Sequence, residues 1–308
     1  MKKYRALVLF PLLFLAAGCT TAGRYPLVNP SLKNLARTPL PPAKLKVEEL
    51  VRRQIGSGAA GHISVYFQSL ATGYWFGINE QEKFIPASLL KGYLLVMFLK
   101  AAETDPGLLH KQVELKDYSW LFANNTAPLP QIKPDQELVF GRSYTVEHLL
   151  SHMIAESDNN AAYNLQMNFL PGGLARVLHD YGIEMPDKEV PFVTVKNYMM
   201  LLLSLYNASY LSIGMSQKAL AYLADSHFRS GLVAGVPPGV KIAHKFGERL
   251  LSTSDGQLMQ LHDCGVVYHK KTPYLLGIMT RGSDLKALEK VITDISALVY
   301  AEVDASAK

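Results

Sequence analysis

Short apolar runs near both ends of the chain, with helical patterns between them, define the predicted organisation. Residues 62–67 and 74–78 are rich in β-branched and aromatic side chains, and the Ala-Thr-Gly sequence at 71–73 between them is typical of a hairpin. Three further strand-like runs follow late in the chain at hairpin-like intervals, at residues 241–246, 258–269 and 274–280. These runs predict an antiparallel sheet formed by both chain ends.

Helical periodicity fills the rest of the chain. An amphipathic helix is predicted at 45–55, an apolar helix from Ser88 and a final amphipathic helix at 285–303. The middle of the chain contains five helical segments, at 146–156, 160–170, 174–182, 195–207 and 217–225. Thr145, Thr194 and Ser216 are the predicted N-caps of three of them. Together with the strands, these helices predict an α+β domain at 45–303, with flanking helices, an all-helical insertion and a short tail at 304–308.

The first 18 residues predict a leader rather than part of the domain. Lys2, Lys3 and Arg5 precede an apolar run at 6–17 that is too short to span a membrane. The run ends in Leu-Ala-Ala-Gly before Cys19, which resembles a bacterial lipobox. That resemblance implies a lipid on Cys19 and, in a Gram-negative cell, an outer-membrane protein that faces the periplasm. The alternative is an ordinary signal peptide with an incidental cysteine.

The segment at 19–44 contains five prolines among polar and basic residues, without sustained periodicity, and predicts a tether. Removing the three positive charges of the leader lowers the net charge from +5 to +2. No stripe of basic residues interleaved with aromatic ones is present, so we expect no nucleic-acid partner. Cys264 is the only other cysteine, and with Cys19 lipidated no intramolecular disulfide can form.

A serine and a lysine at the start of the apolar helix are the first candidate for catalysis. Ser88 and Lys91 are three residues apart, so their side chains share one helix face. A lysine in apolar surroundings loses its preference for the charged form and can act as a base, and a serine beside such a base is an activated nucleophile. S-x-x-K occurs by chance about once in a chain of this length. The pair alone is therefore weak evidence.

Two further motifs follow in order. Ser157-Asp158-Asn159 lies between two predicted helices, where the same residue types also serve as helix caps. Lys245-Phe246-Gly247 ends the strand at 241–246, where the lysine can attract a carboxylate and the glycine allows close backbone approach to a ligand. A solvated strand end is the alternative for that motif.

The order S-x-x-K, S-D-N and K-x-G resembles that of class A β-lactamases and penicillin-binding proteins, over about residues 45–303. The resemblance implies that Ser88 is the acylated nucleophile, Lys91 its base and Ser157 the proton relay to the departing nitrogen. It also implies that Asn159 holds the substrate amide, that Lys245 attracts the substrate carboxylate, and that the backbone N–H groups of Ser88 and Glu248 bind the oxyanion.

Two departures from that family pattern affect the expected substrate and turnover. Phe246 stands where the family has a Thr or Ser hydroxyl, and Arg281 is a candidate replacement for the lost carboxylate contact. The segment after Asn159 lacks the family's Glu-x-x-Leu-Asn sequence, whose Glu positions the deacylating water. Glu184 and Glu189 are candidate replacements, although solvated loop charges are the simpler interpretation.

The sequence therefore predicts a serine hydrolase that forms an acyl-enzyme with a β-lactam or a peptidoglycan-like peptide and deacylates slowly. The alternative is a non-catalytic lipoprotein that binds cell-wall peptide in the same cleft. No cofactor is expected. His148 and His152 share a helix face, but no third ligand or Glu-bearing zinc motif accompanies them, so no metal site is expected.

Overall fold

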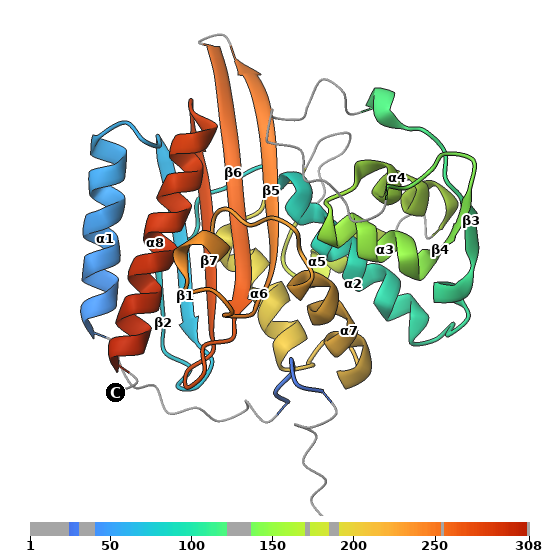
Figure 1. The fold of residues 1–308 in the computed structure, drawn as a ribbon, viewed down its shortest axis with the longest axis horizontal. Coiled ribbons are helices and arrows are strands. Elements are labelled where there is room, and N and C mark those ends of the chain that lie inside the picture. The colour runs from blue at the N-terminus through green and yellow to red at the C-terminus, as the bar shows by residue number, and fades with distance from the viewer. Residues whose placement is uncertain are drawn as a thin grey trace, which may run out of the picture.

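The structure is a computed structural model that describes residues 25–30, 41–121, 137–169, 173–184, 191–253 and 256–306. Cys19, the leader and Glu189 lie outside the described residues. One five-stranded antiparallel sheet dominates the fold, in the order β2-β1-β7-β6-β5 (Figure 1). Its strands are β1 (His62–Ser69), β2 (Trp75–Ile78), β5 (Ile242–Thr253), β6 (Gly256–Val267) and β7 (Tyr274–Gly282). The α+β prediction, with a sheet formed by both chain ends, is confirmed.

The pairing of β1 with β7 joins the two ends of the chain, with Val65 opposite Ile278. At the other side of the sheet, β5 continues to Thr253, well beyond its predicted end at 246, while β6 begins two residues earlier than predicted and ends two residues earlier. Both strands rise above the others (Figure 1). Gly247 and Glu248 are poor strand formers. They are nevertheless within β5 because the antiparallel pairing with β6 continues in register to Thr253.

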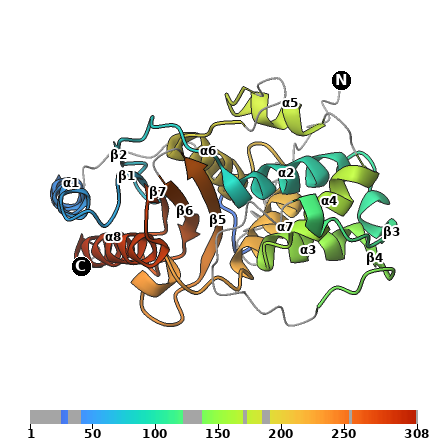
Figure 2. The same ribbon diagram turned by 90° about the horizontal axis from the view of Figure 1, so that it is seen from above.

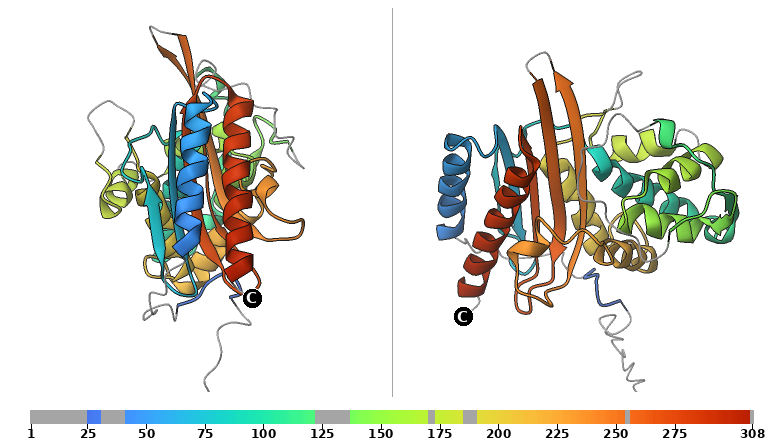
Figure 3. Two further views of the ribbon diagram at one scale, coloured as in Figure 1. Left: turned by 90° about the vertical axis from the view of Figure 1, so that its left-hand side faces the viewer. Right: turned by 45° about the horizontal axis from the view of Figure 1, so that its top comes forward.

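Helices cover both faces of the sheet, as the view from above shows (Figure 2). Helices α1 (Pro41–Gly56) and α8 (Leu285–Ser306) pack side by side on one face (Figure 3). Helix α6 (Val195–Tyr206) packs on the other face against β6 and β7. Successive side chains of β1 alternate between the two faces of the sheet and so contribute to both hydrophobic cores. Val65 and Phe67 belong to the core beneath α1 and α8, and Tyr66 belongs to the core on the opposite face.

The remaining helices form a lobe beside β5. They are α2 (Leu90–Ala102), α3 (Val146–Ala155), α4 (Asn159–Asn168), α5 (Gly173–Asp180) and α7 (Ile213–Ala224). Short 3₁₀ helices precede α2 (η2, Ala87–Leu89) and lie at η3 (Leu108–His110), η4 (Ser119–Leu121) and η5 (Val233–Gly235). Two three-residue strands that the sequence did not predict, β3 (Gln112–Glu114) and β4 (Ser143–Thr145), pair at the outer edge of this lobe.

Two of the three predicted helix N-caps are confirmed, and the third is wrong. Thr145 and Thr194 accept backbone N–H hydrogen bonds at the starts of α3 and α6, as predicted. The prediction of Ser216 as a cap is wrong, because α7 begins four residues earlier and Ser212 caps it. Ser216 lies inside the helix, fully buried, and its hydroxyl donates to the Leu211 carbonyl oxygen.

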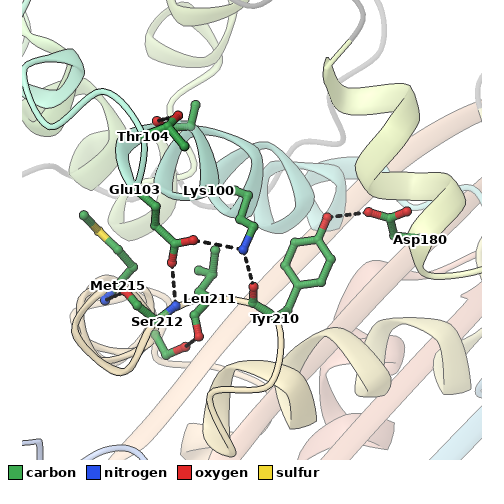
Figure 4. A network of polar contacts seen from close by, with 10 residues as sticks. Lys100, Glu103, Thr104, Asp180, Tyr210, Leu211, Ser212 and Met215 are labelled. Atoms are coloured by element: carbon green, nitrogen blue, oxygen red, sulfur yellow. Dashed lines mark hydrogen bonds and ion pairs between the residues drawn. The ribbon is translucent and has the colours of Figure 1, made fainter.

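Polar contacts attach the far end of α2 to its neighbours (Figure 4). The Lys100 ammonium donates to Glu103 and to the carbonyl oxygen of Tyr210, and Glu103 accepts from the backbone N–H of Ser212. The Tyr210 hydroxyl donates to Asp180 at the end of α5, 2.6 Å away. These contacts hold α2 in the lobe by its C-terminal end, away from Ser88.

The predicted tether at 19–44 needs correction in its described parts. Residues 25–30 pack on the domain because Leu27 and Val28 bury their side chains. The Leu27 N–H donates to Gln217, and its carbonyl oxygen accepts from Tyr268. Residues 41–44 already belong to α1. At the other end, α8 continues to Ser306, so most of the predicted tail at 304–308 is helical.

Candidate active site

The turn that presents Ser88 is short and strained. Pro86 precedes η2, and Ala87 has a φ of 49°, in the left-handed region that non-glycine residues rarely occupy. Ser88 therefore lies in a tight 3₁₀ turn directly before α2. The α2 residues from Lys91 to Leu99 are all buried. Such strain persists only where neighbouring groups hold the backbone, and β5 and β6 supply those groups here.

Gly247 on β5 packs directly against this turn. A Cβ at position 247 would lie 2.9 Å from the Pro86 carbonyl oxygen, 3.0 Å from the Leu89 nitrogen and 3.1 Å from the Ser88 nitrogen. The sequence predicted that this glycine allows a ligand to approach the backbone. The structure gives a different reason, because the space beside Gly247 is occupied by the nucleophile's own turn.

Lys91 is the second residue of α2, three positions after Ser88, and connects two of the predicted motifs. Its side chain is only 7% exposed, and its ammonium group is 3.2 Å from the hydroxyl oxygen of Ser88. It also donates to Ser157 Oγ at 3.2 Å, to the Ser157 carbonyl oxygen and to Asn159 Oδ1 at 2.6 Å. Burial lowers the pKa of Lys91 to about 7, against the opposing charges of Asp158 and then Glu248. An amine with that pKa is largely neutral in mildly alkaline solution and can accept a proton from Ser88.

The Ser157-Asp158-Asn159 motif forms the turn between α3 and α4, as predicted. Ser157 has a φ of 57°, and Asp158 caps α4 by accepting the N–H of Ala161 at 2.8 Å. The cap interpretation therefore holds for Asp158, and the catalytic interpretation of Ser157 and Asn159 stays a prediction. Asp158 fixes the helix start, while Ser157 and Asn159 direct their polar atoms at Lys91.

Lys245 on β5 completes the group from the opposite side. Its side chain is fully buried, and its ammonium donates to Ser157 Oγ at 2.8 Å and to the carbonyl oxygen of Phe246 at 3.0 Å. Burial and then the charge of Lys91 lower the pKa of Lys245 well below its usual value. Ser88, Lys91, Ser157 and Lys245 thus form a continuous chain of hydrogen bonds. The solvated strand end considered for the third motif is wrong.

Phe246 and Glu248 lie on the other face of β5. Phe246 is buried and stacks on Phe228, with ring centroids 4.2 Å apart and planes at 17°. Glu248 is half-buried, and burial raises the pKa of its carboxyl group to about 7. Its Oε2 atom is buried and has no hydrogen-bond partner among the described residues.

A pocket of about 260 Å³ opens beside Ser88. Most of its wall is apolar or uncharged, and its charged lining residues are Lys91, Glu248 and Arg249. The uncharged lining residues are Ala87, Ser88, Leu90, Leu94, Leu121, Asn159, Ala162, Tyr163, Gln166 and Leu174. An apolar acyl group could therefore occupy the space next to the nucleophile.

Arg281 is not among the lining residues of this pocket, and its substrate-binding role stays a prediction. Its guanidinium donates to the carbonyl oxygen of Lys83 at 3.0 Å and lies over the ring of Phe84, 4.9 Å from the centroid. It also approaches Glu82 to 3.9 Å. These contacts use Arg281 to hold the segment that leads into the Ser88 turn. Glu184, a candidate deacylation base, is exposed and is not among the lining residues.

Three residues near the site were missed by the sequence analysis. Arg249 was hidden because the strand was expected to end at 246. Phe228 lies in an irregular segment with no motif. His262 is fully buried, and its ring contacts the carbonyl oxygen of Ile85 at 3.1 Å. In the sheet register His262 pairs with Gly247. The sequence alone does not show this pairing, which places His262 beside the candidate site.

Neither a metal cluster nor a membrane span is found within the described part of the chain. No group of three or more His, Cys, Asp or Glu side chains there could hold a metal ion. His148 and His152 have ring centroids 4.6 Å apart, and Tyr144 stacks on His148. Among the described helices, none combines the length and apolarity needed to cross a bilayer.

Comparison with known proteins supports the same fold. PBP-A is similar over 88% of this chain and 98% of its own, with a TM-score of 0.69 and 20% identity. A class A β-lactamase from Mycobacterium abscessus covers 85% of this chain and 99% of its own, with a TM-score of 0.69 and 17% identity. A β-lactamase from Xanthomonas campestris covers 85% and 98%, with a TM-score of 0.69 and 19% identity.

None of the curated proteins matches the sequence significantly. A family model, however, matches residues 46–303, which is most of the chain and includes all three motifs. This chain belongs to the β-lactamase enzyme family.

Proposed function

We propose that the protein is a serine hydrolase that forms an acyl-enzyme on Ser88 with a β-lactam or a peptidoglycan-like peptide. The observation that supports this most strongly is the hydrogen-bond chain from Ser88 through Lys91 and Ser157 to Lys245. A mutant of PBP-A, which shares the fold, is also known as an acyl-enzyme complex with penicillin G.

The reaction begins when neutral Lys91 takes the hydroxyl proton of Ser88. The Ser88 oxygen attacks the carbonyl carbon, and the backbone N–H groups of Ser88 and Glu248 are the proposed donors to the oxyanion. The C–N bond then breaks. The proton held by Lys91 moves through the Ser157 hydroxyl to the departing nitrogen, so Lys91 and Ser157 end in their starting protonation states.

Hydrolysis of the acyl-enzyme requires an activated water, and we propose that this step is slow. The pocket wall beside Ser88 is formed largely by leucines, alanines and the amide of Gln166. Glu248 is the only carboxylate among the lining residues, and its side chain lies on the face of β5 opposite the Ser88 turn. General-base catalysis is typically worth about 10²–10⁴-fold. A site without that base would accumulate the acyl-enzyme.

A non-catalytic protein that binds cell-wall peptide is the alternative. It would need the pocket but not a base beside the nucleophile. Fluorescent penicillin and a fluorophosphonate should both label the wild type covalently, and Ser88→Ala should abolish the labelling. Equal labelling of the alanine variant would exclude Ser88 as the nucleophile, and no labelling of the wild type would favour the binding protein.

We also propose that Cys19 carries a lipid and anchors the protein in the bacterial cell envelope, at the outer membrane facing the periplasm in a Gram-negative cell. The support is the sequence pattern of a basic segment, an apolar run and Leu-Ala-Ala-Gly-Cys.

A further inference from the structure

Residues 25–30, the N-terminal segment, are attached to one end of the domain. Leu27 is buried, and its carbonyl oxygen accepts a hydrogen bond from the Tyr268 hydroxyl at 3.0 Å. The Asn29 N–H donates to the carbonyl oxygen of Tyr206, the last residue of α6, at 2.7 Å. Figure 1 shows the segment in dark blue below α7, at the lower end of the sheet. The contacts therefore fix where the chain enters the domain.

The same end of the domain carries exposed lysines. Tyr268, which holds the N-terminal segment, lies in the connection between β6 and β7, and its N–H donates to the carbonyl oxygen of Lys241 at 2.9 Å. The side chains of Lys241, Lys270 and Lys271 are all exposed. Asp304 of α8 reaches the same connection, where it contacts a histidine. Three lysines against this one carboxylate leave an excess of positive charge beside the N-terminal segment.

The chain between Cys19 and Tyr25 limits how far the domain can lie from a lipid on Cys19. Tyr25 is the first described residue, and the six residue steps from Cys19 to it span at most about 22 Å. Strand β7, with nine residues, is about 30 Å long. The domain therefore cannot turn its opposite end to the membrane, because the N-terminal segment would then lie further from the surface than the chain can reach.

We propose that this end of the domain faces the membrane, with Lys241, Lys270 and Lys271 against anionic lipid headgroups. The inference rests on the proposed lipid at Cys19 and adds an interaction surface to it. The short chain excludes the inverted orientation, and the attraction of the lysines to the headgroups favours an upright domain over one that lies on its side.

This orientation places the catalytic motifs away from the membrane. Gly247, which packs against the Ser88 turn, is five residues along β5 from the first residue of the strand, next to Lys241. At about 3.3 Å per residue, this distance is about 17 Å. The pocket continues to Glu248 and Arg249, further in the same direction. The site is then within reach of cell-wall peptide, whereas a substrate held in the same membrane would have to span that distance.

Fluorescent labels at the two ends of β7 test the orientation. Thr272→Cys precedes the strand on the lysine side, and Ser283→Cys directly follows it. Cys264 is buried, and burial raises the pKa of its thiol, so the introduced cysteine takes the label. The lipidated protein is placed in vesicles of phosphatidylglycerol and phosphatidylethanolamine that carry a nitroxide on the headgroup. We expect the label at position 272 to be quenched several-fold more strongly than the label at position 283.

A charge variant of the anchored protein tests the lysines separately from the short chain. Lys241→Gln, Lys270→Gln and Lys271→Gln together should shift the equilibrium between upright and tilted domains about 100-fold, roughly fivefold for each lysine beside an anionic surface. The ratio of quenching at the two labels should then approach one. The matched control combines three exposed lysines away from this end: Lys116→Gln, Lys286→Gln and Lys290→Gln. It removes the same charge and should leave the ratio unchanged.

Intact-mass measurement of the labelled protein separates this inference from the proposed anchor. Lipidated protein with equal quenching at both labels, or with stronger quenching at position 283, would overturn the inference alone. A ratio that the lysine variant does not change would overturn the contact of the lysines with the headgroups. Protein isolated from the membrane fraction without a lipid on Cys19 would overturn the anchor and the inference together.

Discussion

The His262 ring lies 3.1 Å from the carbonyl oxygen of Ile85 and so connects the middle of the sheet to the turn that presents Ser88. The Thr280 N–H donates to His262 Nδ1 at 3.3 Å, which makes Nδ1 an acceptor and leaves the proton on Nε2. Nε2 therefore donates to Ile85. Burial lowers the pKa of His262 to about 4, so the ring stays neutral and keeps this arrangement at neutral pH.

Removing this hydrogen bond should slow acylation more than it disturbs the fold. Ile85 is two residues before Ala87, whose φ of 49° needs support from its surroundings. We expect His262→Leu to lower the fluorophosphonate labelling rate of Ser88 about 10-fold or more, since each 1.4 kcal/mol lost is about tenfold in rate. His262→Gln retains a donor and should recover part of the rate.

The matched control for His262 is another buried histidine. His269→Leu removes a ring that contacts Asp304 and not the Ser88 turn. It should lower the melting temperature without changing the labelling rate of the folded protein. Equal slowing by both leucine variants would show that the effect of His262 is general destabilisation.

Gly247 should tolerate no side chain. An alanine Cβ would lie within about 3 Å of three backbone atoms of residues 86–89, and those atoms cannot move independently of Ser88. Overpacking of this kind typically costs about 1–3 kcal/mol. We expect Gly247→Ala to lower the labelling rate at least tenfold, whereas Gly56→Ala, where a Cβ meets nothing within 4 Å, leaves it unchanged. Normal labelling of Gly247→Ala would contradict the proposed role of this contact.

The three motifs could be recognised in the sequence because each is defined by residues that are close together in the chain. Ser88 and Lys91 share one helix face, and Asp158 caps a helix in the usual way, so spacing alone was informative. The contact of Gly247 with the Ser88 turn, 159 positions away in the chain, depends instead on how β5 packs against η2. No local pattern contains that information.

The surroundings of two further residues depend on the same kind of information. Arg281 looked available because a late arginine near a strand end has no visible partner in the sequence. In the structure its partners are Lys83 and Phe84, which the antiparallel sheet brings beside it. Ser216 was chosen as a cap because local propensity could not show that α7 begins at Ile213. Tertiary context decided both cases.

The rate of acylation should rise with pH through about 7. Lys91 acts as a base only when neutral, and burial lowers its pKa to about 7. The negative charges of Asp158 and Glu248 stabilise its charged form and raise that pKa. Asp158→Asn and Glu248→Gln should therefore each move the midpoint of the labelling rate to lower pH, while Glu49→Gln at an exposed position on α1 leaves it in place. A midpoint that moves to higher pH would exclude Lys91 as the titrating base.

Membrane attachment should depend on Cys19. Its thiol is the proposed site of lipidation, so Cys19→Ser should release the protein from the membrane fraction and abolish incorporation of labelled palmitate. The full precursor is expressed in a Gram-negative bacterium, and the intact mass of the mature protein is measured. A serine variant that stays in the membrane fraction with an unchanged mass would contradict the proposed lipid anchor.

Turnover of β-lactams should be limited by deacylation. The pocket beside Ser88 contains the amide of Gln166 and the apolar Leu174, neither of which can activate water. We expect a nitrocefin burst of about one equivalent, followed by slow turnover, and an acyl adduct that intact-mass measurement detects after many minutes. Gln166→Glu places a carboxylate in this wall and should shorten the adduct lifetime, whereas Gln112→Glu on the exposed strand β3 should not. Steady turnover above about 10 per second, within the usual range of efficient enzymes, would show that a base is already present. Glu184→Gln and Glu248→Gln would then identify it.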